Sequence, residues 1–193
     1  MSERKLEPWE LLERKELGDF RIFRLAETRR RSAADGREHS FYLLDTPDWI
    51  NIIGLTPSGE LLLIEQYRNG TDQITLEIPG GMVDDGEDAA TAARRELEEE
   101  TGYRAEELIE LGWVEPNPAF LNNRCTTFLA LGCRPEGKIN FDPAEDIVLR
   151  LRPMEDFTQL IDTGDIRHAL VLAAHDHLQR GISTGAEWVK LLP

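Results

Sequence analysis

The strongest constraint on the fold is a run of four consecutive apolar residues, Leu61–Ile64. It follows a second apolar segment at 49–55, and the residues between them include Pro57 and Gly59 at positions that suit a type I turn. A strand with one face in water alternates apolar and polar residues, whereas consecutive apolar residues indicate that both faces are covered. The sequence therefore predicts a sheet with helices on both sides.

The rest of the carboxy-terminal three quarters supplies the other elements of such a sheet. A first helix is expected at 154–162, ended by Gly164, and a second is expected to begin at a cap formed by Asp165. The histidines of this second helix are interpreted as ordinary helix residues: His168, His175 and His177. Further apolar strands are expected at 107–115, 124–132 and 147–152.

The amino-terminal part lacks helical periodicity and predicts a small antiparallel β unit. Turns are expected at 17–19 and 34–36, separating strands at 9–16, 19–28 and 39–45. The basic cluster Arg29–Ser32 is interpreted either as a solvated hairpin tip or as a segment near a phosphate. Three strands alone are marginal, so this segment is expected to pack on the main domain or on another subunit. The expected division is a β unit at 1–47 and a main domain at 48–193.

Composition narrows the classes of partner. The formal net charge of −15 over 193 residues argues against a nucleic-acid backbone as partner. No apolar run approaches the length that spans a membrane, and the amino terminus does not resemble a signal peptide. Cys125 and Cys133 are too few for a disulfide framework, so we expect reduced core cysteines in a cytoplasmic protein.

A strongly acidic helix is expected within residues 81–103. Its pattern predicts a helix from Glu87, with acidic residues in the first turn, to Thr101, with Gly102 as the stop.

Three carboxylates share one side of this helix. At about 100° per residue, Glu96, Glu99 and Glu100 fall within a third of the circumference, whereas Glu98 points away. Like charges three and four residues apart repel one another. The stripe is therefore expected to face a cation.

The spacing across this stretch resembles the sequence motif of the Nudix hydrolases. The matching residues are Gly81, Glu87, Arg95, Glu96, Leu97, Glu99, Glu100 and Gly102, followed by the bulky Tyr103. The resemblance implies an α+β fold, a Nudix-type α/β/α sandwich with a mixed sheet, and hydrolysis of a pyrophosphate linkage.

The resemblance also implies a metal site. Glu96, Glu100 and the backbone carbonyl of Gly80 would bind Mg²⁺, with Mn²⁺ as a substitute, and Glu99 would be a further ligand or would orient water. Gly80 and Gly81 are also interpreted as turn residues that permit positive φ.

Two further charged groups are assigned by resemblance. Arg95 would help Glu87 orient the glutamates. The acidic loop at 142–147 is similar to the loop that ADP-ribose pyrophosphatases place over their substrate, which makes Glu145 the candidate general base and Asp142 the alternative.

Segments outside the motif resemble the ADP-ribose and nucleoside-diphosphate-sugar branch. Arg68 ends a Gln-Tyr-Arg segment and would grip phosphate oxygens. Glu77 would contact the nucleotide or pair with Arg68, and Pro118 lies at the spacing from Tyr103 that is typical of this branch.

Other residues keep two interpretations. Trp49 could stack on a base or anchor a strand. Asn122, Asn123 and Arg124 could bind a sugar or form a turn and strand.

The sequence therefore predicts a Mg²⁺-dependent hydrolase of ADP-ribose or related nucleoside diphosphate sugars that yields a nucleoside monophosphate and a sugar phosphate. The alternatives are a GDP-mannose-type pyrophosphatase and a Nudix-fold sensor that binds a nucleotide without cleaving it. The resemblance further implies a homodimer formed through the amino-terminal strands.

Overall fold

The computed structural model describes residues 5–141, 143 and 145–193. The chain forms two compact units. The first contains the residues up to Pro47 together with Glu115–Asn123, and the second contains Asp48–Val114 and Arg124–Pro193. The first unit is therefore discontinuous in sequence, because a loop of the main domain belongs to it.

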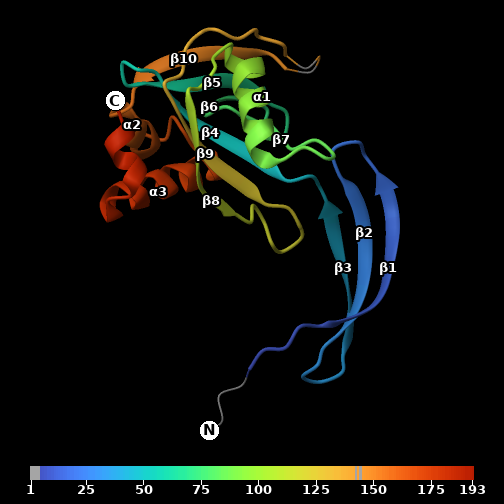
Figure 1. Ribbon diagram of the computed structural model, residues 1–193. Helices are drawn as coiled ribbons and strands as arrows, with labels where there is room; N and C mark the ends of the chain where they lie inside the picture. The colour runs from blue at the N-terminus through green and yellow to red at the C-terminus, as the bar shows by residue number, and fades with distance from the viewer. Residues whose placement is uncertain (1–4, 142, 144) are drawn as a thin grey trace. The chain divides into compact units, whose positions relative to one another are not determined.

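The first unit is built on a three-stranded antiparallel sheet in the order β1-β2-β3 (Figure 1). Its strands are β1 (Glu10–Asp19), β2 (Arg24–Arg31) and β3 (Glu38–Asp45). The turn predicted at 17–19 is wrong, because β1 continues to Asp19 and the chain reverses through Arg21, whose φ is 67°. Gly18 lies within the strand, where a Cβ would come within 2.9 Å of the Phe20 ring. Its glycine makes room for that ring instead of forming the turn.

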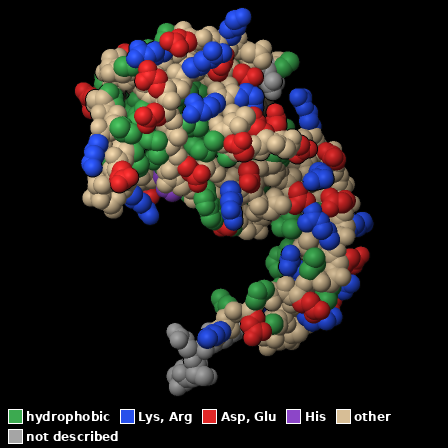
Figure 2. All heavy atoms as spheres, viewed as in Figure 1, with side chains coloured by type: hydrophobic (Ala, Val, Ile, Leu, Met, Phe, Trp, Pro, Cys, Tyr) green, Lys and Arg blue, Asp and Glu red, His purple; other side chains and the backbone are tan. Residues whose placement is uncertain are grey.

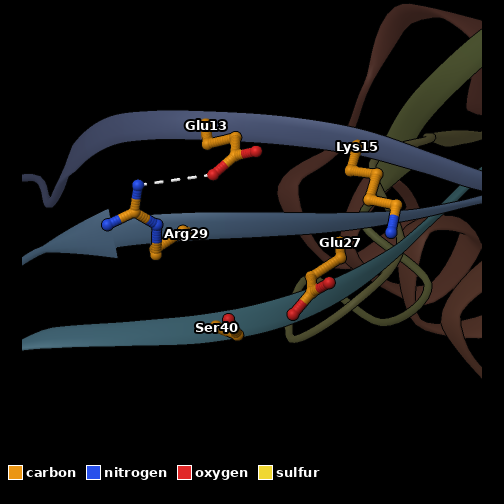
Figure 3. Close-up of a pocket in the computed structure, with 5 residues that line it drawn as sticks. All are labelled: Glu13, Lys15, Glu27, Arg29 and Ser40. Carbon is orange, nitrogen blue, oxygen red and sulfur yellow. Dashed lines mark hydrogen bonds and ion pairs between the residues drawn. The ribbon is translucent and has the colours of Figure 1, made fainter.

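The basic cluster is not a hairpin tip, because Arg29, Arg30 and Arg31 lie in β2. Arg29 pairs with Glu38 at 2.8 Å and with Glu13 at 3.3 Å, and Figure 3 shows the pair with Glu13 across neighbouring strands. Cross-strand acids thus pair with Arg29 and Arg31 in place of a phosphate, whereas Arg30 donates to the carbonyl of Trp9.

A shallow hollow of about 80 Å³ lies on the same sheet, where Figure 3 shows its lining. Ligand pockets usually measure about 300–1,000 Å³, so this hollow is too small for a nucleoside diphosphate. The lining residues are Glu13, Lys15, Glu27, Arg29 and Ser40.

The second unit contains a seven-stranded mixed sheet with the central order β10-β5-β4-β9-β8. Strands β4 and β9 are parallel, whereas the other paired strands are antiparallel. β6 pairs with β5, and β7 pairs with β4. The strands are β4 (Trp49–Leu55), β5 (Glu60–Arg68), β6 (Gln73–Glu77), β7 (Gly80–Met82), β8 (Glu107–Val114), β9 (Cys125–Leu131) and β10 (Ile147–Pro153).

Helices cover both faces of this sheet, as Figure 1 shows. Strand β5, which contains the apolar run Leu61–Ile64, divides its side chains between two cores. Leu62 packs with α1, and Leu61 and Leu63 pack with α2 and α3. The predicted α+β sandwich with a preceding β unit is confirmed. The helices are α1 (Ala89–Thr101), α2 (Asp156–Asp162), α3 (Ala169–Thr184) and the 3-10 helix η1 (Glu187–Leu191).

The start of the last long helix differs from the prediction. Asp165 does not cap α3, because the N-cap residue of that helix is His168. The Asp165 carboxylate instead accepts a hydrogen bond from the Thr163 hydroxyl at 2.6 Å. The helix begins at Ala169, after His168 in an extended conformation. The apolar residue Ile166 is buried ahead of the helix and fixes the connecting segment to the core.

The two cysteines are free and buried, as expected for core residues. Burial raises the pKa of the Cys125 thiol to about 12 and that of Cys133 to about 11, so both are inert thiols at neutral pH. None of the helices in the described parts of the chain has the length and apolar character needed to cross a membrane. On the visible surface, acidic and basic side chains are interspersed (Figure 2).

Candidate active site

The acidic helix α1 is held at its start by a side-chain cap. The carboxylate of Asp88 accepts hydrogen bonds from the backbone N–H of Thr91 at 2.9 Å and from its hydroxyl at 2.8 Å. Glu87 therefore precedes the helix, and its predicted place in the first turn is wrong. Gly102 ends the helix as expected, with φ of 73° in the left-handed region.

Arg95 connects the acidic groups around this helix. Its guanidinium donates to both carboxylate oxygens of Glu87, at 3.1 and 2.9 Å, and to the carbonyl of Met82 at 3.0 Å. Its Nη1 bridges Glu96 at 2.7 Å and Glu99 at 3.1 Å. Arg95 thus joins Glu87 to two of the helix glutamates, as expected for a residue that orients them together with Glu87.

Glu100 is a buried carboxyl group, 2% exposed, that faces the short strand β7. Burial raises its pKa to about 9; the hydrogen bond from the Gly80 N–H at 2.8 Å opposes the shift, and the charges of Glu96 and Glu145 add to it. Burial also raises the pKa of Glu96. These two carboxylates are costly to keep charged without a nearby cation.

The glycines of β7 are needed for close approach, and neither has a positive φ. The turn interpretation of Gly80 and Gly81 is therefore wrong. A Cβ on Gly80 would lie 2.5 Å from the carbonyl oxygen of Ile50. A Cβ on Gly81 would lie 2.8 Å from Oε2 of Glu96 and closer still to its Oε1. The absent side chains let the strand lie directly against its neighbour and against a carboxylate of the helix.

Glu98 points away from this cluster, as the helix geometry predicts. Both of its oxygens accept hydrogen bonds from Arg104, each at 2.8 Å. An ion pair on the far side of the helix thus satisfies this carboxylate.

Arg68 and Glu77 form a bidentate ion pair at the ends of β5 and β6. Nε and Nη2 of Arg68 each donate to a different oxygen of Glu77 at 2.8 Å. Burial alone would raise the pKa of Glu77, but hydrogen bonds from Arg68, His168 and Thr75 hold it well below its usual range. Of the two contacts expected for Glu77, the structure contains the one with Arg68.

Glu145 interacts electrostatically with Arg68 and with the carboxylates of Glu96 and Glu100. Its charge raises the pKa of Arg68 and adds to the raised pKa of Glu96 and Glu100. Asp142, the alternative general base, lies outside the described residues.

The remaining candidates from the sequence lie outside the carboxylate cluster, on β4 and in the loop at 115–123. Trp49 is half-buried at the start of β4, and its backbone N–H donates to the carbonyl of Arg124 at 2.7 Å. Pro118 lies in an exposed turn of the first unit. The side chain of Asn122 donates to Asp45 at 2.7 Å, and that of Asn123 donates to the carbonyl of Pro47 at 3.0 Å. For both asparagines the structure contains contacts within the first unit, in agreement with the turn interpretation.

The donor set fits a hard divalent cation. Within the residues that the structure describes, no three His, Cys, Asp or Glu side chains are already gathered as a metal-binding group, and Arg95 lies between Glu96 and Glu99. The donors are nevertheless carboxylate oxygens, which Mg²⁺ prefers, and burial raises the pKa of two of them. A divalent cation would offset that cost.

Two residues of the Glu77 network were missed by sequence reasoning. Nδ1 of His168, in the segment before α3, lies 3.1 Å from Oε2 of Glu77, and the Thr75 hydroxyl donates from β6 at 2.6 Å. Thr75 could have been found, because it lies two residues from Glu77 and so on the same face of a strand. The contact of His168 joins positions 91 residues apart, and no local pattern reveals it.

The second unit thus has a mixed sheet between helices, with carboxylates of one helix facing a glycine pair. The family follows from comparison with known sequences: the NUDIX domain model matches residues 47–174. The chain belongs to the Nudix family, and the prediction of a Nudix pyrophosphatase is confirmed.

Relatives agree with the expected branch. The chain is 27% identical to an ADP-ribose pyrophosphatase of Bacillus subtilis (strain 168) over 146 residues, which cover 75% of this chain and 79% of that protein. It is 30% identical to a methanol dehydrogenase activator of Bacillus methanolicus, over 69% of this chain and 72% of that protein. The crystal structure of an ADP compounds hydrolase matches with a TM-score of 0.84 and 21% identity, covering 95% of this chain and 99% of that one. This last likeness concerns the fold alone.

Proposed function

We propose that the protein is a Mg²⁺-dependent hydrolase of the diphosphate linkage in ADP-ribose or a related nucleoside diphosphate sugar. Its products would be a nucleoside monophosphate and a sugar phosphate. The observation that carries the proposal is the pair of carboxylates against β7: Glu100 is buried beside Gly80, and Glu96 is half-buried beside Gly81. Arg68 and Glu145 interact electrostatically with Glu100. The relatedness to an ADP-ribose pyrophosphatase supports the substrate class.

Glu96, Glu100 and the carbonyl of Gly80 would hold the divalent cation, with Glu99 as a further ligand. The bound cation would neutralise phosphate charge and lower the pKa of a bound water. Arg95 would keep Glu96 and Glu99 in place, since it already donates to both. Gly80 and Gly81 of the short strand β7 present no side chain that would separate the backbone from the carboxylates.

Arg68 would bind the diphosphate through its N–H groups that do not face Glu77. A guanidinium matches phosphate oxygens in geometry and charge. Its side chain is 44% exposed, whereas the Glu77 side chain is 3% exposed. The arginine is therefore accessible to a ligand while its partner is not.

Glu145 would accept the proton of the attacking water. It is near the cluster, as its effects on Glu96 and Glu100 indicate. The variant Glu145→Gln keeps the size of the side chain and removes the base, so kcat should fall by about 10²–10⁴-fold at saturating Mg²⁺. Unchanged turnover would reject Glu145 as the base.

The function is tested by incubating the protein with a panel of nucleoside diphosphate sugars in ¹⁸O-labelled water with Mg²⁺ or Mn²⁺. Mass spectrometry of the products identifies both the substrate and the phosphorus that water attacks. A preference for GDP-mannose over ADP-ribose would show that the protein is a GDP-mannose-type pyrophosphatase. Binding without any phosphate-ester product would select the nucleotide sensor.

The assembly is proposed to be a homodimer that uses the amino-terminal strands. Exposed apolar side chains on the first unit support this, among them Leu11, Phe20, Ile22 and Tyr42. Sedimentation of the intact protein measures its mass, and a monomer at micromolar concentration would contradict the proposal. Cytoplasmic location remains a prediction.

A further inference from the structure

Glu77 is a buried carboxylate surrounded by hydrogen-bond donors. Oε1 accepts from Nε of Arg68 at 2.8 Å and from the hydroxyl of Thr75 at 2.6 Å. Oε2 accepts from Nη2 of Arg68 at 2.8 Å and lies 3.1 Å from Nδ1 of His168. A carboxylate offers about four acceptor positions, so these donors saturate it. Glu77 therefore has no acceptor position left for a substrate, and we take its exposed partner Arg68 as the group through which it acts.

One of these donors comes from a different part of the fold. Arg68 and Thr75 belong to the β5–β6 hairpin that carries Glu77, whereas His168 precedes α3. A second contact joins the same two segments, because Nη2 of Arg167 donates to Gln73 at 3.3 Å. The hairpin end is thus tied to the start of α3.

The bidentate pair fixes the direction of the Arg68 guanidinium. Because Nε and Nη2 lie along one edge of this planar group, the opposite edge carries Nη1 and points away from Glu77. Any rotation of the Glu77 carboxylate turns this edge with it. The orientation of Arg68 therefore depends on what holds Glu77.

We propose that His168 is a positioning residue for the diphosphate site. Its Nδ1–H donates to Oε2 of Glu77 and fixes the carboxylate that orients Arg68. The proposal rests on the proposed function, because it takes Arg68 as the group that binds the diphosphate. Loss of this donor leaves Oε2 with Arg68 alone and lets the pair rotate as a unit.

A purely structural role for His168 has a different consequence. His168 is the N-cap residue of α3, but no atom of its side chain makes a capping hydrogen bond. Its substitution therefore removes no cap, and a loss of substrate affinity without a loss of stability is the outcome that distinguishes positioning from capping.

The test compares two substitutions of His168 with a control substitution within α3. His168→Phe keeps an aromatic ring and removes the donor, whereas His168→Asn places an amide N–H near the position of Nδ1. The control is His175→Phe, because His175 contacts Thr158 at 3.0 Å and is a residue of α3 that lacks the Glu77 bond. Steady-state kinetics with the preferred diphosphate sugar and urea denaturation are measured for each protein.

Arg68 would bind phosphate oxygens that do not react, so the expected effect lies in KM. We expect His168→Phe to raise KM about fivefold with kcat within about twofold, which is part of the effect of losing a hydrogen bond to a charged group. His168→Asn should restore KM to within about twofold of the wild type, and the control should leave KM unchanged. The urea midpoint of His168→Phe should match that of the wild type.

Equal KM for His168→Phe and the wild type overturns the proposal, and so does an equal rise for the Phe and Asn variants. Failure of the proposed function is seen separately, as absence of hydrolysis by the wild type itself. In that case long-range ¹H–¹⁵N spectra of the protein decide the matter: a proton on Nδ1 of the His168 ring that is lost in Glu77→Leu supports the bond. An unprotonated Nδ1 in the wild type overturns it.

Discussion

Replacement of Gly81 by alanine should separate activity from stability. The added Cβ would lie 2.8 Å from Oε2 of Glu96 and closer to Oε1, well inside van der Waals contact. The obstructed atoms are the far end of a flexible side chain, so the carboxylate can move aside at little energetic cost. It would have to move by roughly 1 Å, and a misplacement of about that size costs on the order of 100-fold in rate.

The free energy of unfolding should change by less than about 1 kcal/mol. Gly81 does not have a positive φ, so alanine adopts its backbone conformation without strain, and Gly→Ala at a compatible position stabilises by only about 0.4–1 kcal/mol through the unfolded chain. The matched control is Gly70→Ala, because a Cβ at Gly70 meets no atom within 4 Å and its φ is also not positive.

The assay combines kcat for the preferred diphosphate sugar at saturating Mg²⁺ with urea denaturation monitored by tryptophan fluorescence. Gly81→Ala should show a kcat about 100-fold below that of Gly70→Ala, with similar urea midpoints. A wild-type kcat for Gly81→Ala would refute the inference that the strand lacks a side chain to accommodate Glu96. A large fall in the urea midpoint of Gly81→Ala would show that the added methyl group disturbs the backbone packing of β7 instead of the Glu96 carboxylate.

Glu100→Gln should lower kcat by at least about 100-fold, a magnitude typical of groups that support a metal site. Glu98→Gln should keep kcat within about twofold, because that carboxylate pairs with Arg104 outside the cluster. Equal losses of kcat in the two variants would contradict the helix geometry. Arg95→Lys should lower kcat about tenfold or more, since an ammonium group cannot span the several acceptors that the guanidinium reaches, and a Mg²⁺ titration of kcat measures it. The pKa of Glu77 is lower in the folded protein than the unfolded value of about 4.5, so its pair with Arg68 stabilises the fold above that pH and less as the pH falls below it. The difference in urea midpoint between the wild type and Glu77→Gln should therefore shrink from pH 7 to pH 4, and a constant difference would be the contrary result.

The sequence predicted those features that depend on local periodicity. The apolar run Leu61–Ile64 required cover on both faces, and its side chains do divide between two cores. The helix advance of about 100° per residue separated Glu98 from its neighbours, and the ion pair with Arg104 confirms that separation. Both inferences concern spacing along one element, which sequence specifies directly.

Features that depend on packing were predicted poorly. Gly18 and Gly81 were both interpreted as turn residues, yet each makes room for a neighbouring side chain, Phe20 in one case and Glu96 in the other. A glycine pattern does not distinguish a positive φ from a close approach. His168 was missed for the same kind of reason, because its partner is distant in sequence.

The discontinuity of the first unit limits how this chain can be rearranged. Residues 115–123 emerge from the main sheet between β8 and β9, yet the N–H of Leu44 donates to the carbonyl of Phe120 at 2.8 Å, and the Asn122 side chain binds Asp45. A chimaera that exchanges only the segment before Pro47 between two relatives would join a strand to a loop that did not evolve with it. Recombination in this family should therefore be most successful when the two sequence segments are inherited together.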